Sequence, residues 1–116
     1  MGKKPPKQLP SIKKTVDETA VLGRARKGVK LREEVWQTDG EVVRYNLAYI
    51  NPLICAVDNG RVLGYDNSHG YHHRHFMGKV KPIEFDSYKA LSERFHAEVN
   101  ELRKEEERNS DKDRKG

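Results

Sequence analysis

The fold is decided by residues 38–50, Thr-Asp-Gly-Glu-Val-Val-Arg-Tyr-Asn-Leu-Ala-Tyr-Ile. An Asp-Gly pair favours the two-residue turn of a β-hairpin, since that turn needs residues that accept positive φ. Behind the turn every second residue is apolar: Val43, Tyr45, Leu47 and Tyr49. Alternation with a period of two is typical of a strand that buries one face. The stretch therefore predicts a strand over 41–50, paired with the segment before the turn.

Two more strands are expected before the turn. Residues 29–37 place Val29, Leu31 and Val35 on one side and charged residues on the other, as a half-buried strand does. Residues 19–26 are compatible with a strand or a helical turn, and we interpret them as a strand. Antiparallel neighbours joined by short turns would make the sheet a meander.

The residues after the hairpin continue the sheet. The apolar run 53–57 predicts a short strand, and Asp58-Asn59-Gly60 is a second hairpin signal that leads into a strand over 61–65. A last strand is expected over 80–85. Pro82 restricts it to an edge position or its start, because proline cannot donate a hydrogen bond to a ladder.

The C-terminal third predicts one amphipathic helix. Asp86 is a suitable N-cap, since its carboxylate can accept bonds from the first free amides of a helix. Apolar residues then recur at steps of three and four: Tyr88, Leu91, Phe95, Val99 and Leu102. Such a stripe packs on a sheet. The predicted fold class is α+β: a single antiparallel meander sheet of four to six strands, packed by one C-terminal amphipathic helix.

Composition predicts one small domain with polar ends. Of the 116 residues, 34% are hydrophobic and 35% are charged, so the core must be thin. The Lys- and Pro-rich residues 1–14 predict a flexible basic arm, which has the alternative role of lying along nucleic acid. Residues 105–116 carry mixed charges and no apolar side chain, which predicts a disordered tail. A single α+β domain is expected over 15–104.

The charge balance limits the classes of partner. A formal net charge of +5 suits an anionic partner such as RNA, and Cys55 alone cannot form an intramolecular disulfide. The sequence has neither the long apolar run of a membrane span nor the apolar core of a signal peptide. We therefore expect a cytoplasmic protein with no membrane partner.

Residues 64–78 hold the candidate site. They contain four of the five histidines in the chain: His69, His72, His73 and His75. Imidazole titrates near neutrality, so a histidine cluster can transfer protons, bind a metal ion or contact phosphate. In a strand, alternation would put His73 and His75 on one face and His72 and Arg74 on the other.

One interpretation of this cluster is a ribonuclease that needs no metal ion or other cofactor. Cleavage by the 2′-hydroxyl requires a base, an acid and cations for the phosphate. The catalytic candidates are His73, His75 and Asp66, with the two histidines as the proton-transfer pair. The candidates for substrate binding are Arg44, Arg61, Tyr65, Asn67, Tyr71 and Arg74.

Two alternatives stay open at this point. His69, His73, His75 and Asp66 form a possible ligand set for zinc or another transition metal, which would make the protein a metal-dependent hydrolase. In a non-catalytic interpretation, Asp66 and Asn67 shape a turn, and the histidines form a surface that binds RNA or a protein.

Motifs around the candidate site match those of a known family. They are Tyr65-Asp66-Asn67, the glycine-containing gap that follows, His73-Arg74-His75, and Pro82-Ile83-Glu84-Phe85 before the terminal helix. Over residues 20–102 the chain resembles the TumE family of toxins from type II toxin-antitoxin systems. His72 stands where the family usually has an acidic residue, and residues 53–60 resemble an insertion.

The resemblance implies a partner and a target. It implies a small toxin that is encoded beside a helix-turn-helix antitoxin and is neutralised by direct binding. By analogy with other small toxins built from a sheet and one or two helices, it implies an attack on RNA.

Overall fold

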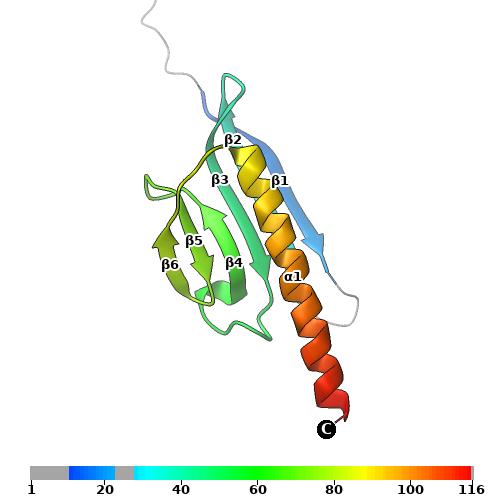
Figure 1. Ribbon diagram of the computed structural model, residues 1–116. Helices are drawn as coiled ribbons and strands as arrows, with labels where there is room; N and C mark the ends of the chain where they lie inside the picture. The colour runs from blue at the N-terminus through cyan, green and yellow to red at the C-terminus, as the bar shows by residue number, and fades with distance from the viewer. Residues whose placement is uncertain (1–10, 23–27, 116) are drawn as a thin grey trace, which may run out of the picture.

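One helix covers one face of a six-stranded antiparallel sheet (Figure 1). The structure is a computed structural model, and it describes residues 11–22 and 28–115. The strands are hydrogen-bonded in chain order, which makes the sheet a simple meander. The elements are β1 (Lys13–Val21), β2 (Lys30–Thr38), β3 (Glu41–Ile50), η1 (Asp58–Gly60), β4 (Arg61–Asp66), β5 (His73–Phe76), β6 (Lys79–Pro82) and α1 (Tyr88–Lys115). The predicted α+β meander with one C-terminal helix is confirmed.

Two tight turns follow from residues that accept positive φ. Asp39 and Gly40, with φ of 50° and 77°, close the β2–β3 hairpin as the sequence predicts. Met77 and Gly78, with φ of 50° and 83°, close the β5–β6 hairpin in the same way. Positive φ at both central residues is the geometry of a type I′ turn, whose twist matches that of the flanking strands.

Residues 53–57 form a loop, so the strand predicted there is wrong. The reason is the buried Asn51, whose carbonyl accepts the backbone N–H of Ile54 at 3.1 Å and of Cys55 at 3.0 Å. Its side chain accepts the N–H of Leu53 at 3.1 Å. These bonds turn the chain away from the extended conformation. The loop ends in η1, and the next strand that pairs with β3 is β4.

A β-bulge changes which residues of β3 are buried. Trp36 pairs with Arg44 and Gln37 pairs with Val42, so Val43 is the extra residue between them. The bulge breaks the alternation at this point, and Val43 is 41% exposed although the pattern predicts it on the buried face. The other three apolar residues of the pattern are buried as predicted: Tyr45, Leu47 and Tyr49.

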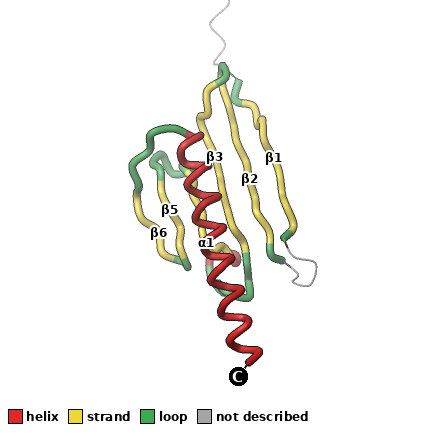
Figure 2. The backbone as a smooth tube through the Cα atoms, turned by 45° about the vertical axis from the view of Figure 1, so that its right-hand side comes forward, coloured by secondary structure: helices red, strands yellow, loops and turns green. Residues whose placement is uncertain are grey.

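The core lies between α1 and the middle of the sheet, where the helix packs on β3 and β4 (Figure 2). The predicted apolar stripe is confirmed, because Leu91, Phe95 and Val99 are buried. Phe95 meets the ring of Tyr65 edge to face. The N-cap is Ser87 instead of Asp86, since the Ser87 hydroxyl accepts a hydrogen bond from the N–H of Ala90 at 3.1 Å.

Several strand ends differ from the prediction. β1 begins at Lys13, inside the predicted arm, and it ends at Val21 instead of residue 26. The predicted arm also covers residues 1–10, and the predicted strand also covers residues 23–26. Residues 1–10 and 23–27 lie outside the described residues. β6 ends at Pro82 instead of residue 85, although Ile83 still donates its backbone N–H to the carbonyl oxygen of His72 at 3.0 Å.

Helix α1 runs through Lys115 and so includes most of the segment predicted as a disordered tail. Glu106 accepts a hydrogen bond from the Tyr49 hydroxyl at 2.7 Å, which ties the helix to the sheet beyond residue 104. The order of the tail in solution and the domain bounds at 15 and 104 stay predictions. Within the described ranges, no helix combines the length and the apolar character that a membrane-spanning segment needs.

Candidate functional site

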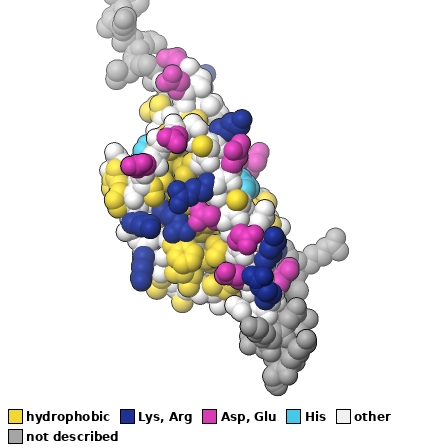
Figure 3. Space-filling view, in the orientation of Figure 1, with side chains coloured by type: hydrophobic (Ala, Val, Ile, Leu, Met, Phe, Trp, Pro, Cys, Tyr) yellow, Lys and Arg dark blue, Asp and Glu magenta, His cyan; other side chains and the backbone are white. Residues whose placement is uncertain are grey.

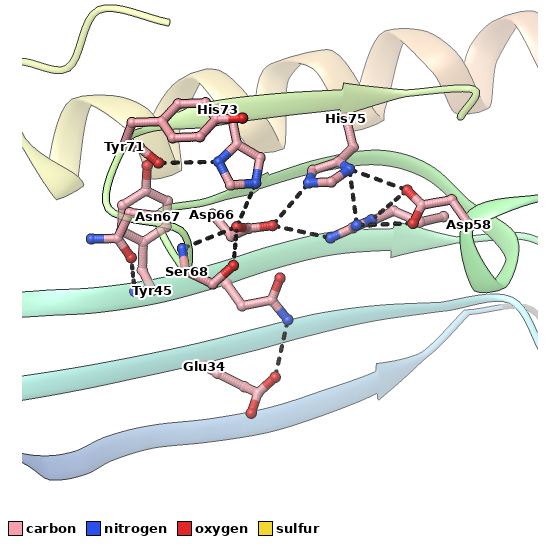
Figure 4. A network of polar contacts seen from close by, with 11 residues as sticks. Glu34, Tyr45, Asp58, Asp66, Asn67, Ser68, Tyr71, His73 and His75 are labelled. Carbon is pink, nitrogen blue, oxygen red and sulfur yellow. Dashed lines mark hydrogen bonds and ion pairs between the residues drawn. The ribbon is translucent and has the colours of Figure 1, made fainter. Parts of the chain in front are cut away.

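Five polar side chains converge on the sheet face opposite α1, at β4 and β5 (Figure 4). They are Asp58, Arg61, Asp66, His73 and His75, called the Asp66 cluster from here on. Asp66 lies directly opposite His73 in the β4–β5 ladder. The prediction that His73 and His75 share one face is confirmed. Both are buried, with 2% and 8% of their surface exposed.

Asp66 is the centre of the cluster, because each carboxylate oxygen faces a different histidine. Oδ1 lies 2.7 Å from Nε2 of His73, and Oδ2 lies 3.0 Å from Nε2 of His75. Ser68 donates to Oδ1 from its backbone N–H at 3.2 Å and from its hydroxyl at 2.9 Å. Burial raises the pKa of Asp66, but the two hydrogen bonds from Ser68 and the charge of His73 outweigh it, and the pKa lies below its ordinary value. Asp66 is thus an ionised acceptor.

The contacts of His75 are those of a neutral ring with its lone pair on Nδ1. Arg61 donates from Nη2 to Nδ1 at 2.9 Å, so Nδ1 accepts, and Nε2 carries the proton that it donates to Asp66. Burial, followed by the charge of Arg61, lowers the pKa of His75. A neutral imidazole whose tautomer is fixed by a carboxylate is the arrangement of a general base.

Both ring nitrogens of His73 face acceptors. Nδ1 lies 3.0 Å from the carbonyl oxygen of Tyr71, and Nε2 lies 2.7 Å from Asp66. Hydrogen bonds at both positions require a proton on each nitrogen, which is the imidazolium form. The geometry therefore fits one neutral and one protonated imidazole, with ring centroids 4.8 Å apart.

Arg61 reaches the cluster because Gly64 has no side chain. A Cβ on Gly64 would come within 2.5 Å of Cδ of Arg61. Asp58 holds the guanidinium by two bonds, accepting from Nε at 2.9 Å and from Nη2 at 3.0 Å. Arg61 also donates to Asp66 at 3.3 Å. The side chains of Asp58 and Arg61 are 24% and 17% exposed, so this is the open end of the cluster.

Tyr71 and His69 lie beside the other end of the cluster. The ring centroids of Tyr71 and His73 are 4.8 Å apart, and those of His69 and His73 are 5.9 Å apart. His69 belongs to the ligand set predicted for a metal ion. Within the described part of the chain, however, the group whose potential ligand atoms all lie within 4.8 Å of one another is Asp66, His73 and His75.

Tyr65, Arg74 and His72 lie on the α1 face, separated from the cluster by the sheet. Tyr65 donates to Glu98, and Arg74 donates to the Tyr65 hydroxyl at 3.1 Å and to Glu98 at 2.6 Å. His72 stacks on Phe85 with 3.9 Å between ring centroids. The face predicted for His72 and Arg74 is confirmed, whereas substrate binding by Tyr65 and Arg74 stays a prediction. Lys and Arg side chains on this side of the molecule are interspersed with Asp and Glu (Figure 3).

Asn67 directly follows β4, and Arg44 lies on the neighbouring strand β3. The Asn67 amide bonds to the backbone of β3, accepting from the N–H of Tyr45 at 3.0 Å and donating to the carbonyl of Val43 at 3.1 Å. Both ends of this amide are therefore engaged by the backbone. Its role in substrate binding stays a prediction. Arg44 is exposed, with its guanidinium 4.6 Å from the ring centroid of Trp36.

Sequence reasoning missed two residues of this site, Asp58 and Ser68. Asp58 belongs to a run that predicts a turn, but it also precedes Arg61 by three residues, which is the ion pair seen here. Ser68 follows Asp66 by two residues, the spacing at which an aspartate side chain bonds to a backbone amide. The spacing of Asp58 and Arg61 could have indicated the ion pair, and the spacing of Asp66 and Ser68 could have indicated the turn.

A comparison with protein families identifies the class to which this fold and site belong. The family model described as Toxin TumE matches residues 16–103, and the chain therefore belongs to the TumE toxin family. The matched range contains all five residues of the Asp66 cluster. No curated protein and no solved structure matches the chain. The resemblance expected from the sequence motifs is confirmed, and a toxin family implies an antitoxin partner.

Proposed function

We propose that this toxin cleaves RNA by proton transfer at the Asp66 cluster, without a metal ion. The observation that supports it is the pairing of His73 and His75 on the two oxygens of one carboxylate, with one ring placed as a cation and the other as a neutral base. Cleavage by the 2′-hydroxyl needs a base and an acid at the same time. A histidine pair in these two protonation states supplies both.

His75 has the role of the base. A substrate phosphate attracts Nη2 of Arg61 away from His75, because a charged oxygen is the stronger acceptor, and the lone pair of Nδ1 becomes free. Nδ1 then takes the proton of the 2′-hydroxyl, and the 2′-oxygen attacks phosphorus. Asp66 stabilises the imidazolium that forms on His75. Arg61 is suited to the first contact because it lies at the open end of the cluster.

His73 has the role of the acid. As the bond between phosphorus and the 5′-oxygen breaks, the leaving oxygen takes a proton from His73. One proton is gained by His75 and one is lost by His73, so the charge of the pair is unchanged. The products are a 2′,3′-cyclic phosphate and a 5′-hydroxyl, and exchange with water restores the starting protonation states.

Charge supports RNA as the target. The chain has a formal net charge of +5, and Arg61 provides a cation within the cluster. We further propose that the antitoxin is a helix-turn-helix protein encoded beside the toxin and that the toxin acts in the cytoplasm. The antitoxin proposal rests on the family resemblance, and the cytoplasmic location is the expectation drawn from the sequence pattern.

Induced expression tests the proposed function. Growth should stop and cellular RNA should fragment when the wild-type toxin is induced. Both effects should disappear with His73→Gln and with His75→Gln, which keep a side chain of similar size but cannot transfer protons. His69→Ala and His96→Ala are matched controls outside the Asp66 cluster and should stay toxic. Growth arrest with intact RNA would instead favour a non-catalytic binding role.

A further inference from the structure

We propose that the Asp66 cluster also binds a divalent transition-metal ion, with Nε2 of His73, Nε2 of His75 and a carboxylate oxygen of Asp66 as its ligands. These residues each offer one atom within 4.8 Å of the other two. Nε2 of His73 lies 2.7 Å from Oδ1 of Asp66, and Nε2 of His75 lies 3.0 Å from Oδ2 of the same carboxylate. Neighbouring ligand atoms around a tetrahedral zinc ion are roughly 3.3 Å apart. Small side-chain shifts would therefore place all three around one ion.

The far nitrogens of both imidazoles are already oriented for metal binding. Nδ1 of His73 lies 3.0 Å from the carbonyl oxygen of Tyr71, and Nδ1 of His75 lies 3.3 Å from a carboxylate oxygen of Asp58. A metal-bound histidine usually donates its second N–H to a carbonyl or carboxylate, which fixes the ring and makes the ligating nitrogen more basic. On metal binding, the proton of His75 moves from Nε2 to Nδ1, and Asp58 replaces Arg61 as the partner of Nδ1.

Local charge favours a cation here once the histidines are neutral. The two carboxylates of Asp58 and Asp66 outnumber the single guanidinium of Arg61, so a negative charge is left over. Arg61 lies 3.3 Å from Oδ2 of Asp66, and the ion is therefore expected on Oδ1, away from that positive charge. Asp66 is 6% exposed, so water screens its attraction for the ion only weakly.

The ligand types indicate the class of metal. Two imidazoles and one carboxylate suit zinc, cobalt, nickel or ferrous iron, whereas magnesium and calcium prefer oxygen ligands throughout. Three protein ligands leave one coordination position open for water.

Metal binding would inhibit the toxin. This consequence rests on the proposed function, whereas the metal site itself is independent of it. An ion on both Nε2 atoms removes the proton that makes His73 an acid. It also leaves His75 with a protonated Nδ1, which cannot act as a base. Zinc is therefore expected to inhibit RNA cleavage.

Titration of the untagged full-length protein with Zn²⁺ and Co²⁺ tests the site without any use of RNA. Calorimetry should show one saturable equivalent per chain, Co²⁺ should give the visible absorption of a tetrahedral site, and the melting temperature should rise. His73→Gln and His75→Gln should abolish saturable binding, and Asp58→Asn should weaken it about 10- to 100-fold. His69→Ala and His96→Ala should bind like the wild type.

Imidazole nitrogen resonances of the wild-type protein provide a second measurement that does not depend on variants that fold. Zn²⁺ should shift the Nε2 signals of His73 and His75 and leave those of His96 in place. Absence of saturable binding by the wild type would overturn the proposal, as would binding that survives in a folded His73→Gln, His75→Gln double variant. If metal binds but RNA is never cut, the site stands and the proposed function fails.

Discussion

The side chain of Arg61 occupies the space that a side chain on Gly64 would need, with 2.5 Å between Cδ of Arg61 and the position of a Cβ. A real Cβ essentially never comes so close to another atom, so the two residues are mutually dependent. Without this room, the guanidinium would not lie beside both Asp66 and His75. Gly64 is therefore a positioning residue for the cluster, although it carries no chemistry of its own.

Gly64→Ala is expected to displace Arg61 and to abolish RNA cleavage while the sheet still forms. The new methyl would also lie 3.1 Å from the carbonyl oxygen of Leu47, so a modest fall in melting temperature is expected. Cleavage rates and thermal melts of the purified variant measure both effects. Arg61→Lys is the matched comparison, since it keeps the charge but loses the guanidinium that contacts His75. Full activity in Gly64→Ala would show that this placement of Arg61 is not needed.

Phe95→Ala is expected to destabilise the fold by about 3–5 kcal/mol, because Phe95 is 1% exposed and its loss leaves a cavity under Tyr65. Domains of this kind are stable by only about 5–15 kcal/mol, so much of the folding free energy would be lost. Denaturant unfolding measures the change. Lys89→Ala, at an exposed position of the same helix, should unfold like the wild type. Similar unfolding curves for both variants would mean that α1 does not pack as described.

His72→Phe should keep RNA cleavage, because His72 lies on the α1 face and away from Asp66. A phenyl ring can replace the imidazole stacked on Phe85, whose centroid is 3.9 Å away. The hydrogen bond to the Tyr45 hydroxyl at 2.9 Å would be lost, at a cost of about 0.5–1.5 kcal/mol. His72→Phe should therefore keep cleavage and lose a little stability, whereas His73→Gln should lose cleavage. Cleavage assays and unfolding curves of both variants measure these effects. Loss of cleavage in a stable His72→Phe variant would place the site on the other face.

The fold was predictable because local signals and tertiary structure agree along most of the chain. The Asp39-Gly40 turn indicates the β2–β3 hairpin. The alternation from Tyr45 to Tyr49 and the helical stripe each indicate a buried face. Residues 53–57 were mispredicted because hydrogen bonds made by the buried Asn51 override the strand propensity of an apolar run. The bulge at Val43 is equally invisible, since it depends on how β2 and β3 pair.

The site was predictable only in part. Strand alternation correctly places His73 and His75 on one face, but it does not reveal that both are buried against a shared carboxylate. Tyr65 and Arg74 belong to the motifs in sequence, yet the same alternation turns them toward Glu98 on the other side of the sheet. Nearness in sequence therefore overstated the number of side chains that meet in one site. The contribution of Asp58 depends on a loop whose conformation the sequence pattern did not predict.

The most direct test of metal-free proton transfer is cleavage of a synthetic RNA by the purified, untagged toxin in the presence of excess chelator. The account predicts cleavage that yields a 2′,3′-cyclic phosphate by mass spectrometry. It also predicts no cleavage by folded His73→Gln or His75→Gln, and none where a 2′-deoxynucleotide replaces the ribonucleotide at the cut site. Cleavage of the 2′-deoxy substrate, or cleavage that occurs only when metal is restored, would contradict it.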